Sequence, residues 1–84
     1  MLHFTKNITF RVVNVDTENC ASYYAVAVNG IDSNFEEIDE AAEFISSQMP
    51  PRSRWALKLP HVIRADDIRW NAEDIKTILL ANIQ

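Results

Sequence analysis

The sequence predicts an α+β fold in which a small antiparallel sheet of three strands carries two helices on one face, in the order β-β-α-β-α. Two observations lead to this class. Some segments alternate apolar and polar residues, as a half-buried strand does, and others repeat apolar residues every three or four positions, as an amphipathic helix does. The length of 84 residues is that of one domain, so residues 1–84 are expected to fold as a single compact unit.

The composition is typical of a small globular protein. Hydrophobic residues make up 48% of the chain and glycine occurs once, which argues against a disordered chain. The formal net charge of −4 favours solubility and opposes nonspecific attraction to nucleic acids or anionic membranes. The single cysteine, Cys20, indicates a reducing compartment, and neither a signal peptide nor a membrane-spanning apolar run is expected. These points together predict a cytoplasmic protein.

Two antiparallel strands are predicted near the N-terminus. Apolar and polar residues alternate over Ile8–Val15, and a polar loop at Asp16–Asn19 connects this segment to a second strand, Ala21–Val28. On one face of the second strand the residues are small, Ala25 and Ala27, so a helix is expected to pack closely there. Apolar residues on both faces are typical of a strand in the middle of a sheet.

The pair Asn29-Gly30 is the strongest short turn pattern in the chain, because both residues tolerate a positive φ. A hairpin at this point requires another strand after the turn. Only Ile31 precedes a run of polar residues, so the turn is predicted to lead directly into a helix.

That first helix is expected over Asn34–Gln48. Ser33 and Glu36 match a capping box, and Pro50-Pro51 ends the helix because proline cannot donate a backbone hydrogen bond. Apolar residues at helical spacing form its buried stripe: Phe35, Ile38, Ala42, Ile45 and Met49.

A third strand and a second helix are predicted in the C-terminal part. Trp55 begins an apolar alternation within Arg54–Leu59, whose other face is basic. The segment 61–70 fits either a short strand or a helical turn. Asn71 is the predicted N-cap of a helix over Ala72–Asn82, with a buried stripe at Ile75, Ile78, Leu79 and Ile83.

Residues suited to catalysis or metal binding are few and scattered, and no enzymatic activity is predicted. The chain contains no nucleophile, phosphate-binding or metalloprotease motif. Cys20 is interpreted as a small residue at a strand entrance, and His3 and His61 share no metal-ligand spacing. Asp66 and Asp67 are flanked by arginines and are expected to form local ion pairs or to cap a helical turn rather than to bind a cation. No catalytic residue, metal site or cofactor is therefore assigned.

The outer face of the acidic helix is the strongest candidate for a working surface. Four carboxylates and one aromatic residue lie away from the apolar stripe: Glu36, Glu37, Glu40, Glu43 and Phe44. Phe44 is interpreted either as packing under a neighbouring loop or as a contact for a partner. The leading hypothesis is a non-enzymatic module that binds a basic surface of another protein through these residues. The size, acidity and lack of motifs resemble the small accessory proteins of bacteriophages and prophages, which implies an accessory or inhibitor role.

Two alternatives use other parts of the chain. Basic residues interleave with Trp55 and Trp70 in the segment 52–70, a composition typical of single-stranded nucleic-acid platforms. The basic residues of this alternative are Arg52, Arg54, Lys58, Arg64 and Arg69. The alternation points Trp55 into the core, which weakens this interpretation. In the other alternative, the N-terminal strand lies at a sheet edge and pairs with its mate in a homodimer.

Overall fold

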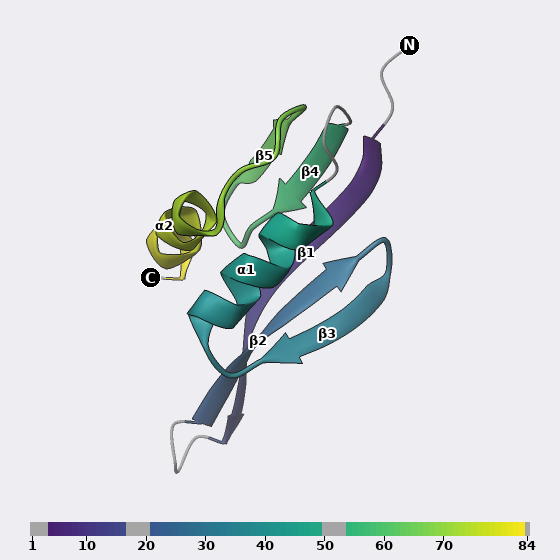
Figure 1. Ribbon diagram of the computed structural model, residues 1–84. Coiled ribbons are helices and arrows are strands. Elements are labelled where there is room, and N and C mark those ends of the chain that lie inside the picture. The colour runs from purple at the N-terminus through teal and green to yellow at the C-terminus, as the bar shows by residue number, and fades with distance from the viewer. Residues whose placement is uncertain (1–3, 17–20, 50–53, 84) are drawn as a thin grey trace.

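The computed structural model describes residues 4–16, 21–49 and 54–83, which form a mixed sheet of five strands with two helices on one face (Figure 1). In chain order the elements are β1 (Phe4–Asp16), β2 (Ala21–Val28), β3 (Ile31–Phe35), α1 (Ile38–Gln48), β4 (Arg54–Lys58), β5 (Ile63–Asp66) and α2 (Ala72–Asn82). The strands lie side by side in the order β3-β2-β1-β4-β5. The N-terminal strand is therefore the central strand of the sheet, whereas the homodimer hypothesis placed it at an edge.

The predicted sheet of three antiparallel strands is wrong in both the number of strands and their directions. β1 and β4 are parallel neighbours, with Ile8 opposite Leu57, while the other neighbouring pairs are antiparallel. Parallel neighbours require a long crossover connection, and α1 provides it by returning the chain along the sheet before β4 begins. Alternation within a strand reports which faces are buried, but it does not report the direction of the neighbouring strand.

β3 is the first strand that the sequence pattern missed. Asn29 and Gly30 have φ angles of 50° and 88° and form the two-residue turn of a hairpin, so Ile31–Phe35 pairs back along β2. The prediction that this turn leads directly into a helix is wrong. β3 is an edge strand, and its first residue, Ile31, is 74% exposed. A strand shows alternating apolar and polar residues when one of its faces is buried. Few side chains of β3 are buried, so its sequence shows no such alternation.

β5 is the second missed strand, and it resolves the segment 61–70 that the sequence left open. Ile63–Asp66 pairs antiparallel with β4 and forms the opposite edge of the sheet. Its side chains are largely exposed, with Ile63 at 64%. A strand of 4 residues with little burial gives no period-two pattern to detect.

The first helix is shorter than the sequence predicts. It begins at Ile38 instead of Asn34, because the preceding residues up to Phe35 belong to β3. The predicted capping box of Ser33 and Glu36 is therefore wrong. The N-cap residue is Glu37, whose side chain makes no capping hydrogen bond.

The second helix and its cap are confirmed. α2 spans Ala72–Asn82, and the Asn71 side chain accepts a hydrogen bond of 2.8 Å from the Asp74 backbone N–H. Of the predicted stripe, Ile75 and Leu79 are fully buried in the core. The remaining stripe residues pack at its margin: Ile78 and Ile83.

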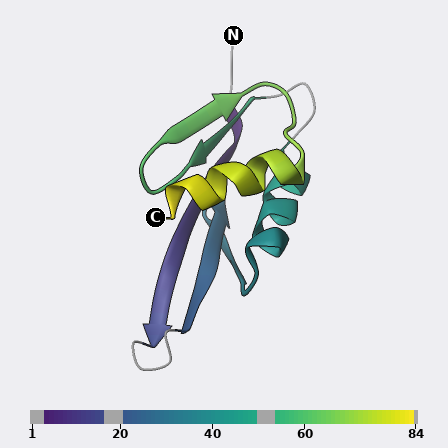
Figure 2. The same ribbon diagram turned by 90° about the vertical axis from the view of Figure 1, so that its left-hand side faces the viewer.

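Both helices contribute to a core on one face of the sheet, and no described helix lies on the other face (Figure 2). Phe10, Val26 and Leu57 point into this core. The expectation that a helix packs against Ala25 and Ala27 is wrong, because successive side chains alternate and these two point the opposite way. We call the uncovered side the open face. It consists of Thr9, Arg11, Val13, Tyr23, Ala25, Ala27, Ala56 and Lys58.

The hairpin of β1 and β2 extends beyond both helices and gives the molecule an elongated shape of 49 × 24 × 21 Å (Figures 1 and 2). Its apolar side chains lie on both faces and are partly exposed: Val12, Val13, Tyr23 and Tyr24.

Several predictions fall outside the described residues, namely those for the loop after Asp16, His3, Cys20, Pro50-Pro51 and Arg52.

Candidate functional site

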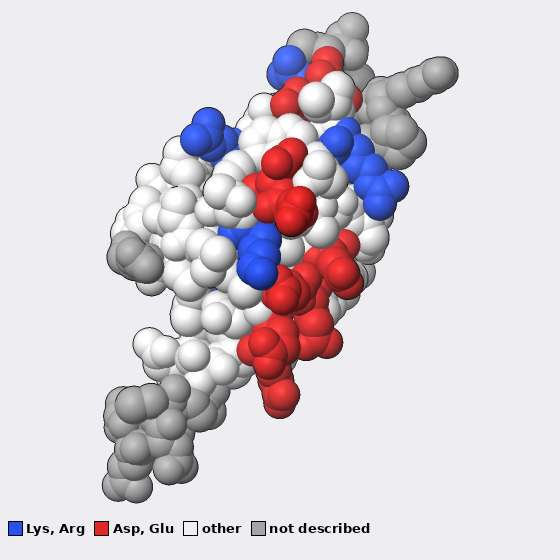
Figure 3. All heavy atoms as spheres, turned by 60° about the vertical axis from the view of Figure 1, so that its left-hand side comes forward, with Lys and Arg blue, Asp and Glu red and all other residues white. Residues whose placement is uncertain are grey.

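The acidic residues around α1 are all on the surface. Glu36 and Glu37 precede the helix, and Glu40 and Glu43 lie on it, each with an exposed side chain. The opposite side of α1 is buried against the sheet and α2 through Ala41, Ala42, Ile45 and Ser46. Figure 3 shows acidic side chains gathered in a band on one side of the molecule.

The second helix extends this acidic side. A groove between the two helices is lined by Asp39, Ala42, Glu43, Ala72, Glu73 and Lys76. We call the combined set the acidic surface: Glu36, Glu37, Asp39, Glu40, Glu43 and Glu73. The contribution of Glu73 could not be found in the sequence, because neither helix pattern shows which turn of one helix lies beside the other. Two residues that line the groove are small, Ala42 of α1 and Ala72 of α2, and small side chains allow the two helices to approach closely.

One cation lies within the acidic surface and joins the helices. Lys76 Nζ in α2 is 2.6 Å from Asp39 Oδ1 in α1. The hydrogen bond to Asp39 and the charge of that carboxylate raise the pKa of Lys76. Both side chains are well exposed, Lys76 at 40% and Asp39 at 65%. An ion pair this accessible to water contributes little to the stability of the fold.

Phe44 of α1 is partly buried against β3. Its ring packs against that of Phe35 in β3, with centroids 5.1 Å apart, and it is partly buried at the margin of the core. Together with Ile31 and Gln48 it lines a shallow hollow near the hairpin turn. Of the two interpretations given for Phe44, packing against a neighbouring element is the one that its surroundings favour.

The structure divides the predicted basic segment among several surfaces. Lys58 is on the open face of β4, whereas Arg64 lies opposite Leu57 and so occupies the helix side of β5. Arg69 is exposed in the connection to α2. Trp55 is 0% exposed, and Trp70 is partly buried against it. Trp55 therefore presents no ring face on which a base could stack.

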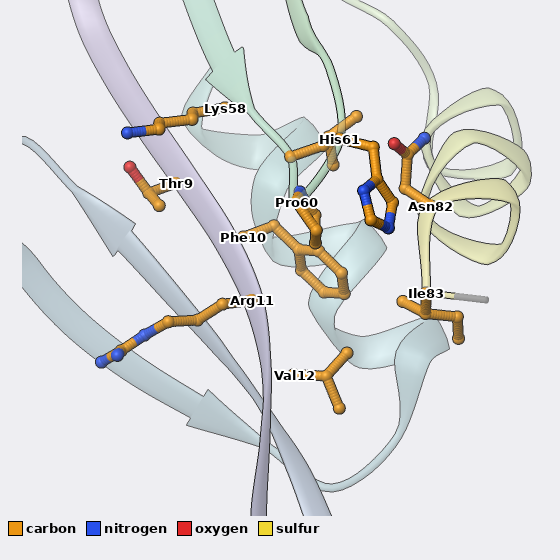
Figure 4. Close-up of a pocket in the computed structure, with 10 residues that line it drawn as sticks. Thr9, Phe10, Arg11, Val12, Lys58, Pro60, His61, Asn82 and Ile83 are labelled. Carbon is orange, nitrogen blue, oxygen red and sulfur yellow. The ribbon is translucent and has the colours of Figure 1, made fainter.

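A hollow of about 410 Å³ lies at the end of β4 (Figure 4). The sequence pattern did not predict it. Thr9, Arg11 and Lys58 lie on one side of β1, and Phe10 and Val12 lie on the other. The remaining lining residues come from the turn after β4 and the end of α2: Leu59, Pro60, His61, Asn82 and Ile83. The hollow therefore surrounds an edge of β1. Arg11 and Lys58 line the same hollow because β1 and β4 are parallel neighbours, which the sequence pattern did not predict.

Of the two adjacent carboxylates in the segment 61–70, Asp66 is tied to the connection that leads to α2. Asp66 accepts hydrogen bonds from the Trp70 indole at 3.0 Å and from the Asp67 backbone at 2.7 Å, and these two contacts lower its pKa. Among the described residues, no group of three or more His, Cys, Asp or Glu side chains is placed to hold a metal ion.

Comparison of the chain with protein-family models, curated proteins and solved structures gives no match. Neither of the two described helices has the length and apolar character needed to cross a membrane.

Proposed function

We propose that the chain is a non-enzymatic interaction module that binds a basic surface of another protein through its acidic surface. The observation that supports this most is the convergence of exposed carboxylates from two separate helices on one side of the molecule (Figure 3). A partner with clustered lysines and arginines would be steered to it by charge. Carboxylates arranged in this way can occupy a phosphate-binding surface, which suits an accessory protein or inhibitor of a nucleic-acid-handling protein.

Helix stability explains part of the acidic surface, but not all of it. Asp39 and Glu40 lie in the first turn of α1, where negative charge is favoured by the helix dipole. Glu43 lies beyond that turn and lines the same groove as Glu73 from the other helix. Like charges placed across a groove repel each other and oppose folding. Lys76 lies in the same groove and offsets part of this repulsion, and a cationic partner would offset more of it.

The experiment compares two variants that remove equal charge from different places. Glu40→Gln with Glu43→Gln removes two charges from the acidic surface, and Asp32→Asn with Asp67→Asn removes two from exposed positions elsewhere. A decalysine peptide serves as the first probe, titrated at low and high salt. Partners captured from cell extract on the wild-type protein are then purified and titrated in the same way.

The glutamine variant should bind the cationic peptide and the purified partner more weakly, and the asparagine variant should bind them as the wild type does. The difference should shrink at high salt, because exposed charges are screened. Equal weakening in both variants would show that only net charge matters and would contradict the proposal. Unchanged binding in the glutamine variant would contradict it as well.

A second candidate function is nucleic-acid binding through the open face. The observation that favours it is the presence of two cations, Arg11 and Lys58, at one hollow, on a sheet face that no described helix covers. Replacing both by Gln should abolish binding to single-stranded oligonucleotides at low salt. A wild-type protein that binds no oligonucleotide under those conditions removes this candidate.

A further inference from the structure

The central strand β1 has a neighbour on both sides for only part of its length. On one side β2 pairs with it from Ile8 to Asp16. On the other side the pairing with β4 ends at Thr9 opposite Lys58. Pro60 follows shortly after and has no N–H with which to continue the ladder. The second half of β1 is therefore an edge, although the strand is central in the sheet.

The direction of the backbone groups identifies which residues form this edge. The Asn29 N–H donates to the Asn7 carbonyl at 2.8 Å, so odd-numbered residues of β1 direct their backbone groups towards β2. Even-numbered residues direct theirs the other way, because the two alternate along an antiparallel pair. Val12 and Asn14 thus present N–H and C=O groups to the side that β4 has left, where no described strand lies beside them.

The residues of this edge are open to solvent, since Asn14 is exposed and Val12 is partly exposed. The ribbon of β1 extends beyond the end of α2 (Figure 2). At the upper limit of the edge lies the hollow of about 410 Å³, which is lined from both faces of the sheet (Figure 4). An added strand would continue the line of β4 and begin at this hollow.

We propose that a second copy of this chain occupies the edge, with the two β1 strands antiparallel about a twofold axis. Val12 and Asn14 are placed symmetrically about Val13, so an antiparallel copy pairs Val12 with Asn14 of its mate and satisfies the exposed groups of both chains. The partly exposed valines of the two hairpins then pack beside each other. This inference concerns a different surface from the acidic surface and does not depend on the proposed function.

The charge on the edge favours an antiparallel pair. Arg11 lies where the edge begins, at the hollow that Lys58 also lines. A parallel copy would place Arg11 beside Arg11, and like charges on neighbouring strands destabilise a pair. An antiparallel copy sets the two Arg11 residues at opposite ends of the paired segment and so keeps these cations apart.

The oligomeric state tests the proposal. Sedimentation of the wild-type chain across a concentration series should show a reversible dimer. Asn14→Pro removes an N–H that points away from β2 and should abolish the dimer while leaving the hairpin paired. The matched control Asn14→Ala removes the same exposed side chain, keeps the N–H and should remain dimeric.

Val13→Lys provides a second test in case the proline variant unfolds. This position lies on the open face and close to the proposed axis, so the substitution sets two cations against each other and should also produce a monomer. A wild-type chain that stays monomeric at every concentration overturns the proposal. So does a dimer that survives in a folded Asn14→Pro or Val13→Lys variant, because such a dimer uses another surface.

Discussion

The indole ring of Trp55 meets that of Trp70 edge-on, with centroids 5.0 Å apart and an interplanar angle of 83°. Trp55 Nε1 donates to the Ile68 carbonyl at 2.7 Å, and the Trp70 carbonyl accepts a bond of 2.7 Å from the Ser46 hydroxyl of α1. The two rings thus fix the connection between β5 and α2 to the sheet and to the first helix. Their position explains why a segment rich in tryptophan and arginine need not be a stacking surface.

Trp55→Phe should destabilise the fold by about 1–3 kcal/mol, because the smaller ring leaves a cavity at a position that is 0% exposed and the Ile68 carbonyl loses its donor. Urea unfolding followed by circular dichroism measures the change. Tyr23→Phe, on the open face, is the comparison and should alter stability by less than about 0.5 kcal/mol. Equal losses in the two variants would contradict the structural role assigned to Trp55.

The Asp66 carboxylate should make stability depend on pH in the acid range. The Trp70 indole and then the Asp67 N–H hold its pKa below the ordinary value of 3.8. The contact therefore stabilises the fold fully above pH 3.8, and this contribution is lost as the pH falls through the lower, folded pKa. Asp66→Asn should be less stable than the wild type at neutral pH, and the difference should narrow in acid.

Urea midpoints for both proteins from neutral to acid pH check this expectation. Trp70→Phe is the control, since it removes the principal donor to Asp66 and should reduce the same pH dependence. A difference between wild type and Asp66→Asn that stays constant with pH would contradict the expectation.

Gly30→Ala should destabilise the fold by about 1–2 kcal/mol through the backbone alone. Gly30 has φ of 88°, and a Cβ placed there would meet no atom within 4 Å, so no steric contact adds to the cost. Ile31→Ala next to it is the comparison, because a side chain that is 74% exposed contributes little. Thermal unfolding of both variants decides the matter, and a neutral Gly30→Ala would mean that the turn is not a tight hairpin.

Lys76→Gln should strengthen binding of a cationic partner, since it removes the positive charge that lies within the acidic surface. Lys58→Gln removes the same charge from the open face and should leave that affinity nearly unchanged. Titrations with decalysine and with the purified partner at two salt concentrations provide the measurement. Weaker binding by Lys76→Gln would contradict this expectation. It would mean either that Lys76 itself contacts the partner or that the acidic surface is not where the partner binds.

The sequence predicted best those helices and strands that bury at least one whole face of side chains. β2 has the predicted bounds Ala21–Val28, because an inner strand is apolar on both faces. α2 and its Asn71 cap were also predicted, since the cap and the stripe agree. β3 and β5 were not, because edge strands of 5 and 4 residues bury too little to leave a pattern.

The candidate surfaces show the same division. The exposure of Glu40 and Glu43 follows from helical spacing within one element, and the structure places both on the surface. The approach of Glu73 to Glu43 and of Arg11 to Lys58 depends on how separate elements pack. The pattern of residues within one helix or strand does not show which residues of another element lie beside it. These neighbours could therefore be identified only from the three-dimensional arrangement.

The parallel pairing of Ile8 with Leu57 also sets the order in which the chain can complete its sheet. β1 leaves the ribosome before the other described strands, and β4, the strand that covers one of its sides, is made much later. Until Lys58 has been synthesised, that side of β1 has no partner among the described strands, and its backbone groups are available to other nascent chains. Early pairing with β2 and β3 into a hairpin meander leaves β1 as an edge for most of translation. Aggregation during synthesis should therefore depend more on the sequence of β1 than on that of any other strand.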